Sequence, residues 1–310
     1  MSKEERIVPA ALAGARLDKA LVELVEGASR ARVKKLIETG GVRVNGRIHP
    51  KGGVLVAEGD KLEFELSEVA SGDESPLPDA SIPLDVRFEN EHLLVVDKPA
   101  GMPSAPIKHG ETGTLANALI AKYPAMEGVG YSKREPGLLH RLDTDTSGLL
   151  VVAKTESAFL RLKEALKDDR VEKEYLLVCA SEGLPDEGSI EFPIANHPKD
   201  QRRVYPCVHP RDVMRYSPRP ASTRYTVEKR TEAWALVRVE VARALRHQIR
   251  AHFSAIGFPL AGDTLYGGAE VPSLTRHALH AARVAYKGEP ELSFDVRSEL
   301  PEELAKLMQA

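Results

Sequence analysis

The chain has 310 residues, of which 42% are hydrophobic and 29% charged, a composition typical of a soluble globular protein with about two domains. No apolar run approaches the ~20 residues of a membrane span. The N-terminus mixes acids with bases and lacks the apolar core of a secretory signal. Cys179 and Cys207 lie too far apart for a disulfide framework or a zinc knuckle, so we expect a cytoplasmic protein with both thiols reduced.

The formal net charge of −3 conceals an uneven distribution of charge. Seven bases stand against one acid over residues 29–51, and twelve bases stand against four acids over residues 201–250. Residues 71–100 hold seven acids and two bases. The near-neutral total argues against a polyanionic partner, whereas two separate basic regions indicate one.

Residues 14–67 are predicted to form a small α+β unit. Its expected elements, in chain order, are a helix over 16–25, a helix capped by Ser29 and stopped by Gly40-Gly41, a hairpin over 42–48 and a strand over 61–66. Asn45-Gly46 is a strong turn signal for the hairpin. Residues 68–83 are rich in Ser, Pro, Asp and Gly and are expected to be a linker.

Residues 84–300 are predicted to form a second domain, in which strands dominate. The expected strands are 93–97, 148–153, 175–180, 224–228 and 235–241, and the expected helices are 114–123, 156–167 and 246–256. Intermittent helices favour an α+β fold with a mixed, mainly antiparallel sheet and flanking helices over a regular βαβ winding.

The N-terminal unit presents a basic helix beside a basic turn. The predicted RNA-binding side chains are Arg30, Arg32, Lys34 and Lys35 of the second helix and Arg43 and Arg47 of the hairpin. Such an arrangement suits contact with phosphates rather than reading of bases. The order RLDKAL, SRARVKKLIETGGVRVNG and a closing strand resembles the alpha-L RNA-binding domain. The alternative is an ordinary surface-charged α+β unit.

A polar loop that carries His140, Arg141, Asp143 and Asp145 runs directly into an apolar strand. Loops held by strands commonly present catalytic groups. Asp143 and Asp145 have no third carboxylate or histidine at ligand spacing, so we expect no metal there. The chain also lacks a P-loop and a Rossmann glycine pattern, which indicates chemistry without a nucleotide cofactor.

The stretch His140-Arg-Leu-Asp-Thr-Asp-Thr-Ser-Gly148 resembles the HRLD-xx-TSG motif of RluA-type pseudouridine synthases. The resemblance continues through Leu93–Pro103, Lys173-Glu-Tyr175 and His247-Gln-Ile-Arg-Ala-His252 followed by Gly257–Gly267. It covers residues 84–298. It implies the family fold and isomerisation of uridine to pseudouridine in RNA.

By this resemblance Asp143 is the catalytic carboxylate, Tyr175 packs against the target uracil and helps to remove the carbon 5 proton, and Arg250 pairs with Asp143. Arg141 fills the gap that the flipped base leaves in the RNA, and His140 is placed among the RNA-binding residues. His247 is given no chemical role. Where the family has Gly-Arg-Thr/Ser before His-Gln-Ile-Arg, this chain has Ala244-Leu245-Arg246, which puts the RNA target in question.

The resulting hypothesis is a cytoplasmic, monomeric RNA pseudouridine synthase without cofactor, metal or membrane association. The appended RNA-binding domain favours large-subunit ribosomal RNA as the substrate, with transfer RNA as the second choice. Two other classes stay open: a non-catalytic RNA-binding ribosome-assembly factor, and a hydrolase that uses Asp143 and Asp145 as paired carboxylates.

Overall fold

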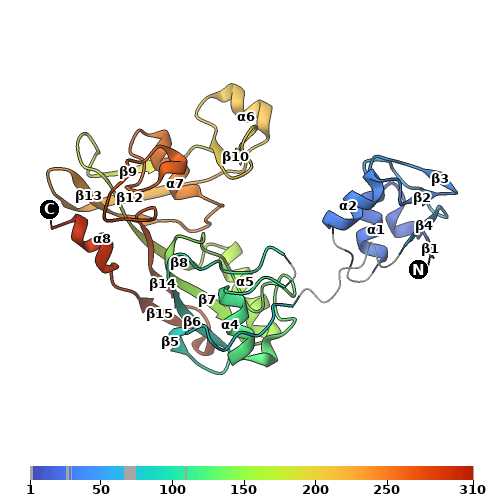
Figure 1. The fold of residues 1–310 in the computed structure, drawn as a ribbon, viewed down its shortest axis with the longest axis horizontal. Helices are drawn as coiled ribbons and strands as arrows, with labels where there is room; N and C mark the ends of the chain where they lie inside the picture. The colour runs from blue at the N-terminus through green and yellow to red at the C-terminus, as the bar shows by residue number, and fades with distance from the viewer. Residues whose placement is uncertain (1–2, 26–27, 29, 66–74, 109, 310) are drawn as a thin grey trace. The chain divides into compact units, whose positions relative to one another are not determined.

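The computed structural model describes residues 3–25, 28, 30–65, 75–108 and 110–309, and the chain divides into two compact units between residues 74 and 75 (Figure 1). The first seven residues of the predicted linker, 68–74, lie outside the described residues. The remainder belongs to the C-terminal unit, where Asn117 Nδ2 donates to the carbonyl of Leu77 at 2.8 Å. That unit therefore begins at residue 75 rather than at 84.

The N-terminal unit packs two helices on a four-stranded sheet. Its elements are β1 (Lys3–Ile7), the short η1 (Ala10–Leu12), α1 (Leu17–Leu24), α2 (Arg30–Glu38), β2 (Arg43–Val44), β3 (Arg47–Ile48) and β4 (Lys61–Glu65). The strand order is β1-β4-β2-β3. Leu17, Leu21 and Ile37 of the helices are buried in one core with Leu62 and Phe64 of β4.

The predicted hairpin is present, because Asn45 and Gly46 adopt the left-handed φ angles of 51° and 78° that a two-residue turn between strands requires. The predicted cap Ser29 and the end of the last strand, Leu66, lie outside the described residues. β1 pairs with β4 along its whole length, so the unit begins before the predicted residue 14.

The C-terminal unit is built on a nine-stranded sheet. Its strands are β5 (Asp85–Glu89), β6 (Leu93–Lys98), β7 (Ser147–Ala153), β8 (Val171–Ala180), β9 (Glu187–Ile190), β12 (Thr223–Arg230), β13 (Trp234–Glu240), β14 (Leu279–Tyr286) and β15 (Phe294–Arg297). The order is β5-β6-β7-β14-β8-β13-β12-β9, with β15 beside β14. Among these strands only β7 and β14 pair in parallel. The predicted mixed, mainly antiparallel α+β fold is confirmed.

Helices flank this sheet, and a two-stranded sheet stands apart from it. The helices are α4 (Leu115–Lys122), α5 (Glu156–Lys167), α6 (Pro210–Tyr216), α7 (Gln248–Ala255) and α8 (Glu302–Leu307), with single turns η2 (Pro124–Met126), η3 (Thr264–Tyr266) and η4 (Pro290–Leu292). β10 (Ile194–Asn196) and β11 (Val204–Pro206) form the separate pair. No helix among the described residues has the length and apolar character that crossing a membrane demands.

Both faces of the central strands are covered, which explains their continuous apolar runs. Side chains alternate along β6, so Leu94 and Val96 share a core with Leu119 of α4, whereas Leu93 and Val95 share another with Phe159 of α5. Figure 1 shows α4 and α5 beside β6 and β7 in this part of the molecule. The polar loop that precedes β7 is thereby fixed to the middle of the sheet.

The five predicted strands and three predicted helices of this unit are present, with one informative difference. The helix expected over 246–256 begins at Gln248, because His247 adopts a left-handed φ of 53° and turns the chain before the first helical residue. This bend directs the His247 side chain toward the predicted catalytic loop.

We expect Gly148→Ala to destabilise the protein by more than about 2 kcal/mol, since its φ of +115° is unfavourable for alanine and a Cβ would lie 2.3 Å from the carbonyl oxygen of Ala281. Gly128→Ala is the matched control: its φ is +81°, but a Cβ there meets nothing within 4 Å, so the cost is about 1 kcal/mol. Urea unfolding measures both, and equal losses would contradict the close-approach argument.

Candidate active site

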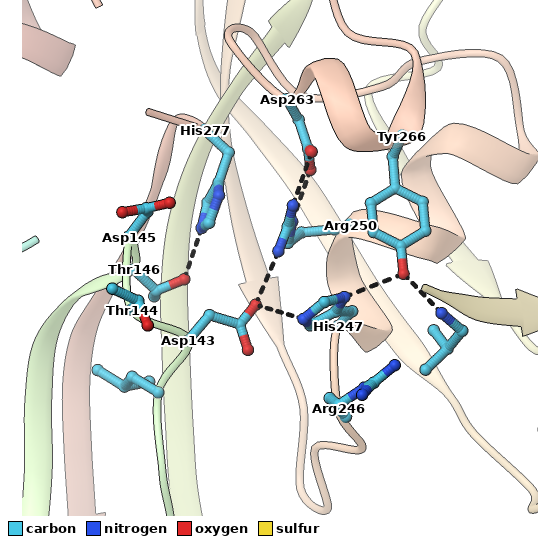
Figure 2. Close-up of polar contacts among 12 residues, drawn as sticks. Asp143, Thr144, Asp145, Thr146, Arg246, His247, Arg250, Asp263, Tyr266 and His277 are labelled. Atoms are coloured by element: carbon cyan, nitrogen blue, oxygen red, sulfur yellow. Dashed lines mark hydrogen bonds and ion pairs between the residues drawn. The ribbon is translucent and has the colours of Figure 1, made fainter. Parts of the chain in front are cut away.

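The loop that carries Asp143 is held on both sides of that residue. Ser104 Oγ donates to the carbonyl of Leu142 at 2.9 Å, and Lys98 Nζ donates to the carbonyl of Thr144 at 3.1 Å. Two residues after Thr144, Thr146 Oγ1 forms a hydrogen bond with His277 Nε2 at 2.7 Å (Figure 2). Burial and nearby cations lower the pKa of His277 to about 2. The loop is thus pinned by buried groups, which leaves the Asp143 carboxylate in a defined position.

Arg250 joins two carboxylates. Its Nη1 donates to Asp143 Oδ2 at 3.0 Å, while Nε and Nη2 donate to the two oxygens of Asp263 at 2.6 and 2.8 Å (Figure 2). The Asp263 side chain is 1% exposed, that of Arg250 8% and that of Asp143 24%. Burial opposes the charge of Arg250, but its bonds to Asp263 and Asp143 raise its pKa above the ordinary value. Asp263 is therefore the buried anchor, and Asp143 is the end that reaches the surface.

His247 is a second basic group at Asp143. Its Nε2 lies 3.6 Å from Asp143 Oδ2, and its Nδ1 lies 3.1 Å from the hydroxyl of Tyr266 (Figure 2). That hydroxyl accepts from the backbone N–H of Val204 at 2.8 Å, so its own proton is available for Nδ1. This network favours the ring tautomer with its proton on Nε2, facing Asp143. Burial lowers the pKa of His247, although Asp143 opposes the shift.

Tyr175 lies on β8 and is buried, with Asp143 among the residues that line the same cleft. Burial, followed by the negative charge of Asp143, raises the pKa of the Tyr175 phenol. The phenol therefore stays protonated at neutral pH. Packing against the uracil and help in removing the carbon 5 proton both stay predictions for this ring.

A cleft of about 890 Å³ opens beside these groups. Its charged lining residues, within the described chain, are the bases Arg141, Lys163, Lys167, Lys173, Arg219, Arg243 and Arg246 and the acids Glu135 and Asp143. Both acids already have basic partners, since Glu135 Oε1 accepts from Arg141 Nη1 at 2.7 Å and Asp143 from Arg250. The cleft is therefore suited to a polyanion.

The other predicted site residues fall into two groups. His140 is a half-buried loop residue whose Nε2 accepts from the backbone N–H of Val151 at 3.2 Å, and burial together with Lys173 lowers its pKa to about 3. Its ring is neutral and holds the loop, so it offers a phosphate no charge. Arg30, Arg32, Lys34, Lys35, Arg43 and Arg47 are exposed on the N-terminal unit.

Asp145 does not join Asp143 in a pair. Its side chain is exposed, and Figure 2 shows its carboxylate turned away from Arg250. Among the described residues, no group of three or more His, Cys, Asp or Glu side chains is placed to hold a metal ion. A hydrolase with Asp143 and Asp145 as paired carboxylates has no support in this geometry.

Two contributors were missed from the sequence. Asp263 stands in the segment Gly257–Gly267 that carries part of the resemblance, but a single buried acid has no pattern of its own. His247 was given no chemical role, because its contact depends on the left-handed turn at its own backbone. In the segment Ala244–Arg246, which differs from the family pattern, Arg246 Nη2 donates to the carbonyls of Gln201 and Arg203, both at 2.8 Å. These bonds join the segment before α7 to the turn before β11.

Comparison with known proteins identifies the family of the chain. A family model described as RNA pseudouridylate synthase matches residues 92–255, and the S4 domain model matches residues 15–62. The chain is 34% identical to ribosomal large subunit pseudouridine synthase D of Yersinia pestis, over 96% of this chain and 91% of that protein. It is 35% identical to an uncharacterized RNA pseudouridine synthase of Synechocystis sp., over 88% and 81%.

A solved structure, human RNA pseudouridylate synthase domain containing 1, covers 75% of this chain and 96% of its own with a TM-score of 0.55 at 23% identity, which shows a shared fold. The family matches confirm both predicted resemblances: that of the C-terminal unit to the pseudouridine synthases and that of the N-terminal unit to the alpha-L RNA-binding domain. The chain belongs to the RNA pseudouridylate synthase family and carries an S4 domain at its N-terminus.

Proposed function

We propose that this enzyme converts specific uridines of large-subunit ribosomal RNA to pseudouridine, with Asp143 as the catalytic carboxylate. The observation that carries the proposal is the Asp143–Arg250–Asp263 chain of ion pairs, which ends at a base-rich cleft beside a buried tyrosine. The name of the Yersinia pestis relative supports ribosomal RNA as the substrate. Transfer RNA stays the alternative for the same chemistry.

The reaction is an isomerisation, so no atom is gained or lost overall. The bond between the ribose and N1 of uracil breaks, the base turns, and a bond between the ribose and carbon 5 forms. Carbon 5 loses its proton to solvent and N1 takes up a proton, so the composition of the nucleotide is unchanged. Asp143 supplies the negative charge at the ribose or the base that this sequence of steps needs. Arg250 and the Nε2–H of His247 orient its carboxylate.

The target base must first leave its stack, at a cost of a few kcal/mol. The ring of Tyr175 offers a stacking surface that recovers about 1–3 kcal/mol. Arg141 is exposed at the rim of the same cleft, where it is placed to fill the position that the base vacates.

The exposed bases of the N-terminal unit support phosphate contacts outside the cleft. A non-catalytic assembly factor would use the same unit, but it has no need of a carboxylate held between a buried arginine and a histidine. A cytoplasmic location and a monomeric state stay predictions from the sequence.

We expect Asp143→Asn to lower tritium release from RNA labelled at uridine carbon 5 by about 10⁴-fold or more, because the amide lacks the negative charge. Asp145→Asn is the matched control, since its side chain is exposed in the same loop, and it should retain near-normal release. Persistent release in Asp143→Asn would overturn the assignment of the carboxylate. No release from the wild-type protein on unmodified ribosomal RNA would contradict the proposed substrate.

Arg250→Ala leaves the buried Asp263 carboxylate without its partner and should cost about 3–5 kcal/mol of folding free energy, as well as activity. The double variant Arg250→Ala/Asp263→Ala removes the unpaired charge. It should regain part of the lost stability but none of the lost activity, because Asp143 still lacks its guanidinium partner. Urea unfolding and tritium release measure the two effects, and a double variant no more stable than Arg250→Ala would refute the anchoring role of Asp263.

Lys34→Gln/Lys35→Gln should weaken RNA binding and make the slope of log K against log salt shallower by about 1–2, if each lysine neutralises one phosphate. The rate at saturating RNA should be unchanged, because both residues are exposed on the N-terminal unit. Lys19→Gln, on the exposed side of α1, is the control. A salt slope equal to that of the wild type would argue against phosphate contact by α2.

A further inference from the structure

Alternation along β8 places Lys173 beside Tyr175. The two residues are separated by one position, so both side chains point to the same face, about 7 Å apart along the strand, and both line the cleft. Glu172 and Glu174 lie on the opposite face, where Arg283 Nη1 binds them at 2.8 and 2.6 Å. Glu172 and Glu174 therefore pair with Arg283 on the opposite face of β8 and do not pair with Lys173.

Lys173 is a largely buried lysine without an acceptor among the described residues. It is 8% exposed, yet its ammonium makes no hydrogen bond or ion pair with any residue that the structure describes. The buried Lys98 is different from Lys173, because its Nζ donates to three backbone carbonyls at 2.8, 2.7 and 3.1 Å. The Lys173 Nζ atom is not among the buried polar atoms that lack a partner, so it meets the solvent of the cleft. A cation that has lost most of its solvent is stabilised by an acceptor on a molecule bound in that cleft.

The charges around Lys173 favour binding of an anion. Arg243 lines the same cleft and donates to the carbonyl of Lys167 at the end of α5, which fixes its guanidinium near the lysine. Burial lowers the pKa of Lys173 to about 8, with Asp169 opposing this shift and Arg243 adding to it. The neighbouring His140 is neutral and brings no charge. Lys173 is therefore still cationic at neutral pH, on a wall where cations predominate.

We infer that Lys173 binds a phosphodiester group of the RNA strand directly beside the nucleotide whose base packs on Tyr175. The inference rests on the proposed function, which supplies an RNA strand in this cleft. A phosphodiester carries one full charge and acceptor oxygens, which suit the compact ammonium of a lysine. In the bound RNA, the base then packs on Tyr175 and the adjacent phosphate binds Lys173, two alternate residues of β8.

The binding test uses a short, fluorescein-labelled single-stranded RNA with one central uridine. It is compared with two versions in which the phosphate on the 5′ or the 3′ side of that uridine is a neutral methylphosphonate. The wild type should bind one of these versions about tenfold more weakly than the charged RNA. Lys173→Met should bind the charged RNA about tenfold more weakly and no longer distinguish the two, with a salt slope shallower by about 0.7.

Lys287→Met, an exposed lysine outside the cleft, is the control and should behave like the wild type. The inference is overturned if Lys173→Met still binds the charged RNA more tightly than the methylphosphonate version, or if the wild type binds all three RNAs equally.

Thermal unfolding gives a second, independent readout. The folded-state pKa of Lys173 is about 8 against an ordinary value of 10.5, so its charge destabilises the RNA-free fold below pH 8, and this effect disappears as the pH rises toward 10.5. Lys173→Met should therefore unfold at a higher temperature than the wild type at pH 7, with the difference shrinking at higher pH. A lower unfolding temperature at pH 7 would make Lys173 a structural residue and overturn the inference.

The outcome is separable from that of the proposed function. If tritium release depends on Asp143 but Lys173→Met binds all three RNAs as the wild type does, the phosphate site fails and the function stands. If the charged and neutralised RNAs are distinguished through Lys173 while release persists in Asp143→Asn, the phosphate site stands and the catalytic assignment fails.

Discussion

The buried guanidinium of Arg250 is the constraint around which the C-terminal unit is arranged. A fully buried arginine is tolerated only when its charge and its donors are matched, and Asp263 provides a two-point match within the core. On the cleft side, Nη1 donates to Asp143. The fold thus holds the Arg250 guanidinium at the wall of the cleft, where it orients the carboxylate of Asp143. Asp263 pairs with the buried side of the same guanidinium.

This arrangement depends on strands that are distant in sequence. β7 begins immediately after the loop of Asp143 and pairs in parallel with β14, at the level of Ser147 and His280, while β8 lies antiparallel on the other side of β14. Gly148 permits the close approach, since a side chain there would meet the backbone of Ala281. The loop of Asp143 and the ring of Tyr175 are thereby brought to the same level in the middle of the sheet, since Ala281 of β14 is opposite Gly148 on one side and Tyr175 on the other.

Sequence reasoning succeeded where a signal is local. Asn45-Gly46 predicts its hairpin, and the apolar run that begins at Leu93 predicts a central strand, because turn geometry and side-chain alternation are properties of neighbouring residues. The family motif located Asp143. Asp263 and His247 were not found, since their importance lies in what faces them across the fold: a guanidinium in one case, and a carboxylate reached through a left-handed turn in the other.

The net charge of −3 is reconciled with an RNA substrate by where the acids are used. On β8, alternation sends the glutamates to Arg283 and leaves Lys173 on the face of the cleft. Within the cleft, Glu135 and Asp143 are each engaged by an arginine. The local field is then set by the remaining bases, and walls of low dielectric concentrate it. A small total charge with a base-rich cleft and a basic N-terminal unit favours binding of RNA at these two surfaces over weak attachment across the whole protein.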